Sequence, residues 1–181
     1  MSGPTDSGVT APGRPVTAVV VGNPKAGSRT LSAAVAVARD LTGHDAELVI
    51  DLAGLGPALL DWSSAEVADL VAQVGQARLV VVASPTYKGT YTGLLKLFLD
   101  RFAAGTGLSG IAIALMLGAS PVHALAPELC LRPLLTELGA VIPGRGLYLI
   151  DSQYDDPEAR AAWLAATLPV VRRLLLPEAA E

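Results

Sequence analysis

The stretch TAVVVGNPKAGSRTL, residues 17–31, decides the fold class of this chain. It begins with an apolar, β-branched run at Thr17–Val21, passes through a loop with two glycines, and enters a segment of helical composition at Leu31. Continuous rather than alternating hydrophobicity indicates a strand buried on both faces, as in a parallel sheet covered by helices. The stretch is therefore typical of the strand, loop and helix that open an α/β domain.

The same strand signature recurs further along the chain, at Leu48–Ile50, Leu79–Ala83, Ile111–Leu117 and Leu147–Ile150. Segments of helical composition alternate with these runs, at Leu31–Leu41, Ser64–Gln76, Thr92–Ala104, Ala124–Leu138 and Pro157–Leu176. This alternation predicts a three-layer, doubly wound α/β fold with a five-stranded parallel sheet, for which we prefer strand order 2-1-3-4-5. Ligands of such sheets bind beyond the carboxyl ends of the strands, where the strand order reverses.

Local signals refine the ends of three helices. Ser63 and Glu66 have the spacing of a capping box at the start of the second helix. Pro157 suits the first turn of the last helix. Pro133 and Pro169 lie inside helical segments and are expected to kink or shorten them.

The length of 181 residues suits one domain with a sizeable core. Residues 1–15 are rich in Gly, Pro, Ser and Thr and predict a flexible leader, whereas residues 16–176 predict a single domain and residues 177–181 a short tail. Gly, Pro or charge interrupts every apolar stretch before the roughly 18 residues of a membrane span, and a signal-peptide pattern is lacking. We expect a cytoplasmic protein without a membrane partner.

Composition also argues against several functions. The formal net charge is −4 and 4% of residues are aromatic, whereas nucleic-acid binding requires basic surface and stacking platforms. Cys130 is the single cysteine and there are two histidines, so no metal site is expected. The three lysines, Lys25, Lys88 and Lys96, lie in or beside the two loops described next, where positive charge suits a small anion.

The loop Gly22–Thr30 brings two glycines, hydroxyl groups and two cations to the start of a helix, where backbone N–H groups and the helix dipole attract phosphate. It lacks the Lys-Ser/Thr ending of a Walker A loop and the middle glycine of a dinucleotide fingerprint. A monophosphate is therefore expected, held by Ser28, Arg29, Thr30 and Lys25. The alternative is a polar turn that caps a helix without a ligand.

The loop Ser84–Gly93 follows the third strand and carries Tyr87 and Tyr91. Exposed backbone with an aromatic ring or two suits a planar heterocycle such as a flavin. Alternatively, both tyrosines only cap the core.

Together, GNPKAGSRT at 22–30 and SPTYKGTYTGLLKLFLD at 84–100 resemble the NADPH-dependent FMN reductase family, particularly the alkanesulfonate-utilisation type of flavin reductase. The likeness extends over residues 16–176 and includes GASPVH at 118–123. It implies a flavodoxin-like fold and an oxidoreductase that transfers hydride from NADPH or NADH to FMN. It also implies that reduced flavin supplies a partner monooxygenase.

The resemblance further implies which residues hold FMN. The first loop binds the phosphate through Asn23, Lys25, Ser28, Arg29 and Thr30. The second loop borders the isoalloxazine ring with Pro85, Thr86, Tyr87, Lys88 and Gly89. The third loop approaches the pyrimidine side with Gly118, Ala119 and Ser120, although Leu117–Ala119 departs from the Thr-Gly-Gly of the sulfonate-type relatives. No side chain is expected to be an obligatory catalyst, because hydride transfer needs mainly stacking and proximity.

A homodimer or homotetramer with flavin near the subunit boundary is also implied, and the apolar Leu94–Phe102 face agrees with a covered surface. Lys96 and Asp100 form either a surface ion pair or an intersubunit contact. Some relatives carry an inserted Tyr that forms a π-bulge at the tetramer interface. This chain has Leu129 at about that place, like the relatives that retain flavin more readily.

Other functions compatible with these loops are an FMN-containing quinone or azo reductase, a flavodoxin-type electron carrier, and a flavin-free binding protein. His123 is expected to satisfy backbone groups rather than to act as an acid. Cys130 is expected to be a buried, inert thiol.

Overall fold

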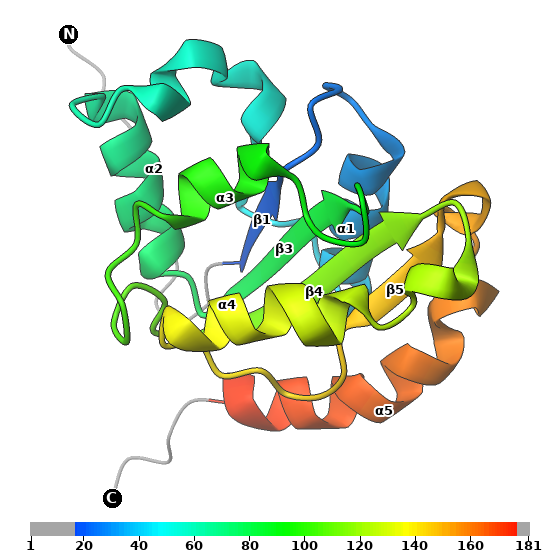
Figure 1. The fold of residues 1–181 in the computed structure, drawn as a ribbon. Helices are drawn as coiled ribbons and strands as arrows, with labels where there is room; N and C mark the ends of the chain where they lie inside the picture. The colour runs from blue at the N-terminus through cyan, green and yellow to red at the C-terminus, as the bar shows by residue number, and fades with distance from the viewer. Residues whose placement is uncertain (1–16, 177–181) are drawn as a thin grey trace, which may run out of the picture.

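A computed structural model describes residues 17–176 and contains one five-stranded, fully parallel sheet (Figure 1). The strand order is β2-β1-β3-β4-β5, which confirms the predicted topology. The strands are β1 (Thr17–Val21), β2 (Leu48–Asp51), β3 (Leu79–Pro85), β4 (Ile111–Gly118) and β5 (Leu147–Ile150). Strands β2, β3 and β4 extend one or two residues beyond their predicted carboxyl ends. The expected leader and tail lie outside the described residues.

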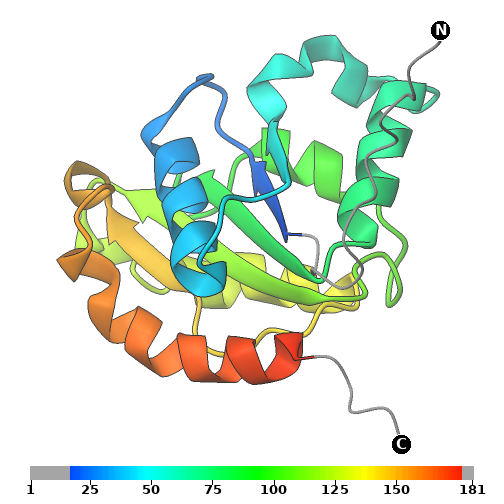
Figure 2. The same ribbon diagram turned by 180° about the vertical axis from the view of Figure 1, so that it is seen from behind.

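Helices cover both faces of the sheet (Figures 1 and 2). They are α1 (Arg29–Thr42), α2 (Ala65–Gly75), α3 (Gly93–Leu99), α4 (Arg132–Glu137) and α5 (Glu158–Leu175). Side chains alternate along each strand, so Ala18 and Val20 of β1 pack into one core with α2, α3 and α4. Val19 and Val21 point the other way, into the core with α1 and α5. None of the helices within residues 17–176 is long and apolar enough to cross a membrane.

Several helix ends differ from the prediction. Helix α3 ends at Leu99, five residues before the predicted Ala104. The N-cap of α2 is Ser64, whose Oγ accepts a hydrogen bond from Val67 N at 3.4 Å, so the predicted capping box at Ser63 is wrong. Ser63 instead donates to Asp61 Oδ1 at 2.6 Å. Helix α5 runs through Pro169 to its end at Leu175, so this proline does not shorten the helix.

The predicted helix Ala124–Leu138 is not uniformly α-helical, because a π-helix at Pro127–Leu131 leads directly into α4 at Arg132. Residues Pro127–Leu131 form a π-helix in which Arg132 N donates to Pro127 O, five residues back. Pro133 has no N–H, and its ring conflicts with the carbonyl four residues earlier, which disfavours continuous α-helical bonding here. A π-helical turn therefore forms without the tyrosine that the family resemblance associates with it.

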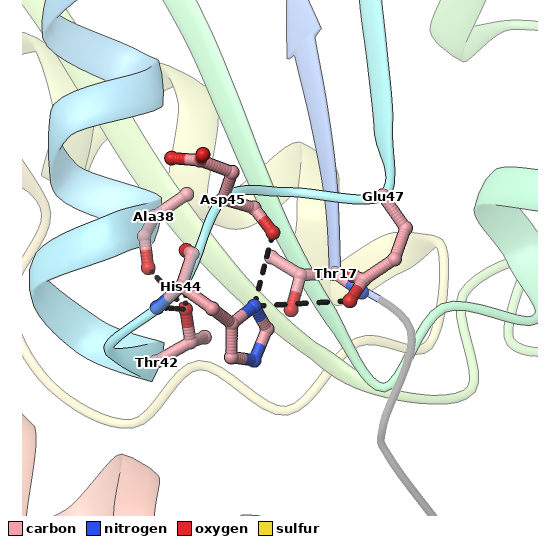
Figure 3. A network of polar contacts seen from close by, with 6 residues as sticks. All are labelled: Thr17, Ala38, Thr42, His44, Asp45 and Glu47. Atoms are coloured by element: carbon pink, nitrogen blue, oxygen red, sulfur yellow. Dashed lines mark hydrogen bonds and ion pairs between the residues drawn. The ribbon is translucent and has the colours of Figure 1, made fainter. Parts of the chain in front are cut away.

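The amino-terminal edge of the sheet carries a network of structural contacts (Figure 3). Glu47 Oε2 accepts a hydrogen bond from Thr17 N at 2.8 Å, and Glu47 Oε1 lies 3.7 Å from His44 Nδ1. Thr42 Oγ1 bonds the carbonyls of Ala38 and His44. These contacts join the end of α1 to the starts of β1 and β2. The loops of the candidate site lie at the other end of the strands, where the strands have their carboxyl termini.

Candidate functional site

A cavity of about 510 Å³ lies beyond the carboxyl ends of β1, β3 and β4. The strand order reverses between β1 and β3, because β1 is followed by β2 on one side and β3 by β4 on the other. Ligands of doubly wound sheets are expected at this point. The residues that line it are Asn23, Lys25, Gly27, Ser28, Arg29, Pro85, Thr86, Tyr87, Leu117, Gly118, Ala119 and Asp151.

The first loop is held by its own polar side chains. Asn23 Oδ1 accepts a hydrogen bond from Lys25 N at 3.0 Å, and its Nδ2 donates to Thr30 Oγ1 at 3.0 Å. Ser28 is the N-cap of α1, and its Oγ accepts from Leu31 N at 3.3 Å. These contacts aim the amino-terminal end of α1, with its partial positive charge, at the cavity.

Two carboxylates from other parts of the chain contact this loop. Arg29 Nη1 lies 2.5 Å from Asp151 Oδ2, which follows β5, and the guanidinium also lies 5.9 Å from the centre of the Tyr154 ring. Gly27 has a positive φ of 62°, a backbone conformation that favours glycine. Its N–H donates to Asp51 Oδ2 at 2.9 Å. The loop therefore combines cationic and N–H donors with two carboxylates.

The second loop ends in a tight hairpin turn that presents Tyr87. Tyr87 N donates to Thr90 O at 2.9 Å and Thr90 N to Tyr87 O at 3.2 Å. Lys88 and Gly89 between them have φ values of 54° and 84°, which is the pattern of a type I′ turn. The backbone of Lys88 lies in the left-handed region, which is unfavourable for a residue other than glycine, so the turn stores backbone strain. The Tyr87 side chain stays 52% exposed at the cavity rim.

Two buried hydroxyl groups fasten the second loop to the first. Thr92 is the N-cap of α3, and its Oγ1 accepts from Leu95 N and donates to Gly22 O at 2.5 Å. Ser84 Oγ accepts from Thr92 N at 3.0 Å. A Cβ on Gly22 would collide with Leu95, so glycine is needed where α3 crosses the end of β1. The loops that line the two sides of the cavity are thus joined to each other.

The third loop is supported from β5 by Tyr148. The Tyr148 hydroxyl donates to Ser120 O at 2.7 Å and fills the space that a Cβ on Gly118 would need. Burial raises the pKa of the Tyr148 phenol, and the neighbouring Thr86 hydroxyl counteracts this effect. Thr86 Oγ1 is itself buried at the cavity without a hydrogen bond of good geometry. Its backbone N donates to Leu117 O at 2.6 Å.

The structure brings most of the predicted site residues together. Asn23, Lys25, Ser28, Arg29, Pro85, Thr86, Tyr87, Gly118 and Ala119 line the cavity, whereas Thr30, Lys88, Gly89 and Ser120 do not. Thr30 is 1% exposed, because its hydroxyl is turned inward to Asn23. Asp151 is a lining residue that the sequence interpretation missed, whereas Gly27 and Leu117 lie in predicted loops without having been among the predicted site residues.

His123 and Cys130 both lie near the hairpin turn rather than in the cavity. The His123 ring is 3.8 Å from where a Cβ of Gly89 would be, and Cys130 Sγ is 3.8 Å from Gly89 O. His123 is exposed, and its ring makes no hydrogen bond among residues 17–176, so the expected backbone contact is absent there. Cys130 is partly rather than fully buried.

Fold and cavity together define a class: a flavodoxin-like α/β protein with an anion-binding helix start beside a site for a planar group. A solved flavodoxin from the domain Archaea shares this fold with a TM-score of 0.56 at 13% identity, and covers 88% of this chain and 99% of its own. The profile of the NADPH-dependent FMN reductase family matches residues 16–155. The chain belongs to that family, which confirms the expected flavin-linked oxidoreductase with FMN and NADPH or NADH as its cofactors.

Individual relatives agree with this assignment. The chain is 32% identical over 148 residues to the "NADH-dependent FMN reductase SfnF" of Pseudomonas fluorescens (strain Pf0-1), covering 78% of this chain and 79% of that protein. It is 30% identical over 141 residues to "FMN reductase (NADPH)" of Escherichia coli (strain K12), covering 76% and 74%. The solved apo form of an NADH:FMN oxidoreductase (EMOB) superposes with a TM-score of 0.76 at 30% identity, covering 93% and 92%.

The residues present fit FMN. The cavity volume lies within the range of about 300–1,000 Å³ that is usual for ligand pockets. The start of α1 with Arg29 supplies donors for a phosphate. At the other side, Gly118 lines the cavity without a side chain, and the buried Thr86 hydroxyl has a hydrogen-bonding capacity that a ring edge with donors and acceptors would use.

Proposed function

We propose that this chain binds FMN in the cavity between the loops after β1, β3 and β4 and reduces it with NADPH or NADH. The observation that carries the proposal is the convergence of three loops of suitable chemistry on one cavity at the switch point of the sheet. Family membership makes flavin the planar group expected there.

Each loop has a distinct part in this proposal. Ser28, Arg29 and the first N–H groups of α1 hold the phosphate, and Lys25 adds positive charge. The Pro85–Tyr87 segment and the Gly118–Ala119 backbone border the ring and keep water from one side. FMN, when bound, accepts hydride and passes electrons on, so the protein contributes binding, orientation and exclusion of solvent.

We further propose that the reduced flavin is delivered to a partner monooxygenase. This step is supported by relatives whose names give FMN as the compound they reduce, because reduced FMN that leaves the protein is available to a second enzyme. A cytoplasmic location belongs to the same proposal, since a chain with a single cysteine needs no oxidising compartment to fold.

An anaerobic titration tests the proposal directly. FMN is added to the purified chain while flavin absorbance is followed, and NADPH or NADH is then mixed in a stopped-flow instrument. Rapid bleaching of bound flavin supports the reductase, whereas binding without bleaching indicates an electron carrier, and no binding overturns the site. Steady-state turnover on free FMN, a quinone and an azo dye then separates a flavin reductase from a quinone or azo reductase.

We also propose that the chain forms a homodimer or homotetramer through an apolar face near the π-helix. Val122, Leu125 and Leu129 are 76%, 57% and 70% exposed, which is much for side chains of this type. The Leu94–Phe102 face is less suited to this role, because Leu95, Phe98 and Leu99 are buried within the subunit.

Light scattering distinguishes the two faces. Leu129→Glu is expected to yield a smaller species than the wild type, and Leu97→Glu on the outer side of α3 is expected to leave the assembly intact. The reverse pattern moves the interface to α3, and a monomeric wild type removes the proposal.

A further inference from the structure

Two carboxylates from outside the first loop engage its anion-binding donors. Asp51, the last residue of β2, accepts the Gly27 N–H at 2.9 Å through Oδ2. Asp151, directly after β5, lies 2.5 Å from Arg29 Nη1 and lines the cavity. Each therefore bonds a donor that a phosphate in this loop would also use.

Two further backbone N–H groups in and beside the first loop are already bonded within the loop. Lys25 N donates to Asn23 Oδ1 and Leu31 N to Ser28 Oγ, so these two N–H groups are engaged as well. The formal charges of Lys25 and Arg29 are matched by those of Asp51 and Asp151. A phosphate monoester carries a charge of about −1.5 to −2 near pH 7, and like charges a few ångströms apart repel each other.

We infer that Asp51 and Asp151 compete with the flavin phosphate for the first loop and thereby keep FMN an exchanging substrate rather than a permanently held group. This inference rests on the proposed function, since it concerns FMN in the same cavity. It also differs from the expectation of flavin retention drawn from Leu129. In the competition, Arg29 and the Gly27 N–H exchange a carboxylate oxygen for a phosphate oxygen.

A purely structural role for these carboxylates makes the opposite prediction. Asp51 Oδ1 also accepts a hydrogen bond from Ala53 N at 3.3 Å and caps the 3₁₀ turn Leu52–Gly54. If the carboxylates only shape the loop, their removal weakens the binding of every flavin. If they compete with phosphate, their neutralisation strengthens the binding of FMN but not of riboflavin, which has the ring and no phosphate.

The experiment measures dissociation constants of FMN and riboflavin by flavin fluorescence for the wild type, Asp51→Asn, Asp151→Asn and the double variant. Asparagine keeps the shape and one acceptor oxygen, so the Ala53 cap is retained. Asp69→Asn, an exposed carboxylate on α2 away from the cavity, controls for net charge. Because the Arg29 pair is exposed, we expect each single variant to bind FMN about three-fold tighter and the double variant about ten-fold tighter.

The riboflavin affinities of the Asp51 and Asp151 variants are expected to match that of the wild type within about two-fold. The FMN affinity of Asp69→Asn is expected to match the wild type equally closely. Slower FMN dissociation from the double variant in a stopped-flow displacement would give the same result by a second readout. The inference is overturned if the double variant binds FMN no tighter than the wild type, or if its riboflavin affinity increases equally. In either case, FMN binding by the wild type leaves the proposed function standing. A wild type that binds neither flavin overturns both.

Discussion

Arg29 carries the phosphate assignment at the scale of single residues. Arg29→Ala removes a charge-assisted hydrogen bond and is expected to weaken FMN binding by about 1.5–3 kcal/mol. Riboflavin has no phosphate, so its affinity is expected to stay unchanged. Flavin fluorescence titrations measure both, and Arg39→Ala near the other end of α1 serves as the matched control. Unchanged FMN affinity in Arg29→Ala would place the phosphate elsewhere.

Gly118 and Tyr148 form a second testable pair. A Cβ on Gly118 overlaps the Tyr148 hydroxyl, so Gly118→Ala is expected to lower the free energy of unfolding by about 1–3 kcal/mol. Tyr148→Phe removes the nearest conflicting atom, and the double variant is therefore expected to lose less than the sum of the single losses. Urea denaturation measures all three variants. Strict additivity would contradict the steric explanation.

The residues of the site were predictable to unequal degrees. Asn23, Ser28 and Arg29 were found because glycines and hydroxyl groups after a buried strand are local signals. Asp51 and Asp151 were not, since they reach their partners across 24 and 122 residues of sequence and such contacts leave no local pattern. Thr30 has the right residue type, but its hydroxyl is turned inward by a hydrogen bond from Asn23 in the same loop.

The capping of α2 gives a prediction at the scale of elements. Ser64→Ala removes the hydroxyl that accepts the Val67 N–H and is expected to cost about 1 kcal/mol of stability. Ser63→Ala leaves this cap intact and is expected to cost less. Thermal or urea unfolding of the two variants compares neighbouring serines directly. A larger loss for Ser63→Ala would restore the capping box that the sequence suggested.

Elements were predicted better than their ends. The cores of β1, β3 and β4 follow from burial on both faces, whereas the last residues of β2, β3 and β4 are polar, small or proline and carry no hydrophobic signal. The π-helix at Pro127–Leu131 was missed because its cause is a proline that follows the segment, and because hydrophobic periodicity does not distinguish a π-turn from an α-turn.

At the scale of the whole molecule, bound FMN is expected to stabilise the fold. A ligand at 100 times its dissociation constant adds about 2.7 kcal/mol to the free energy of unfolding. For a domain of this size the Tm is expected to rise by about 5–10 °C. Differential scanning fluorimetry or calorimetry measures the shift, and Arg29→Ala is expected to need more FMN to reach it. A Tm that does not respond to FMN would contradict binding to the folded state.

The topology was predictable because a doubly wound sheet leaves few alternatives once five buried strands alternate with helices. Which surface the apolar face of α3 packs against was not predictable from the sequence. Its apolar residues suggested a contact between subunits, but within residues 17–176 Leu95, Phe98 and Leu99 fill the subunit's own core. An amphipathic pattern indicates that a face is covered and does not indicate by what.

The polar network of Thr17, His44 and Glu47 at the amino-terminal edge of the sheet has a practical consequence (Figure 3). All cavity-lining residues come from the opposite edge. Asp45, whose side chain is 79% exposed, is therefore a suitable position at which to introduce a reactive side chain for attaching the protein to a solid support. A molecule immobilised there turns its cavity toward the solution, where soluble electron donors and acceptors reach it freely.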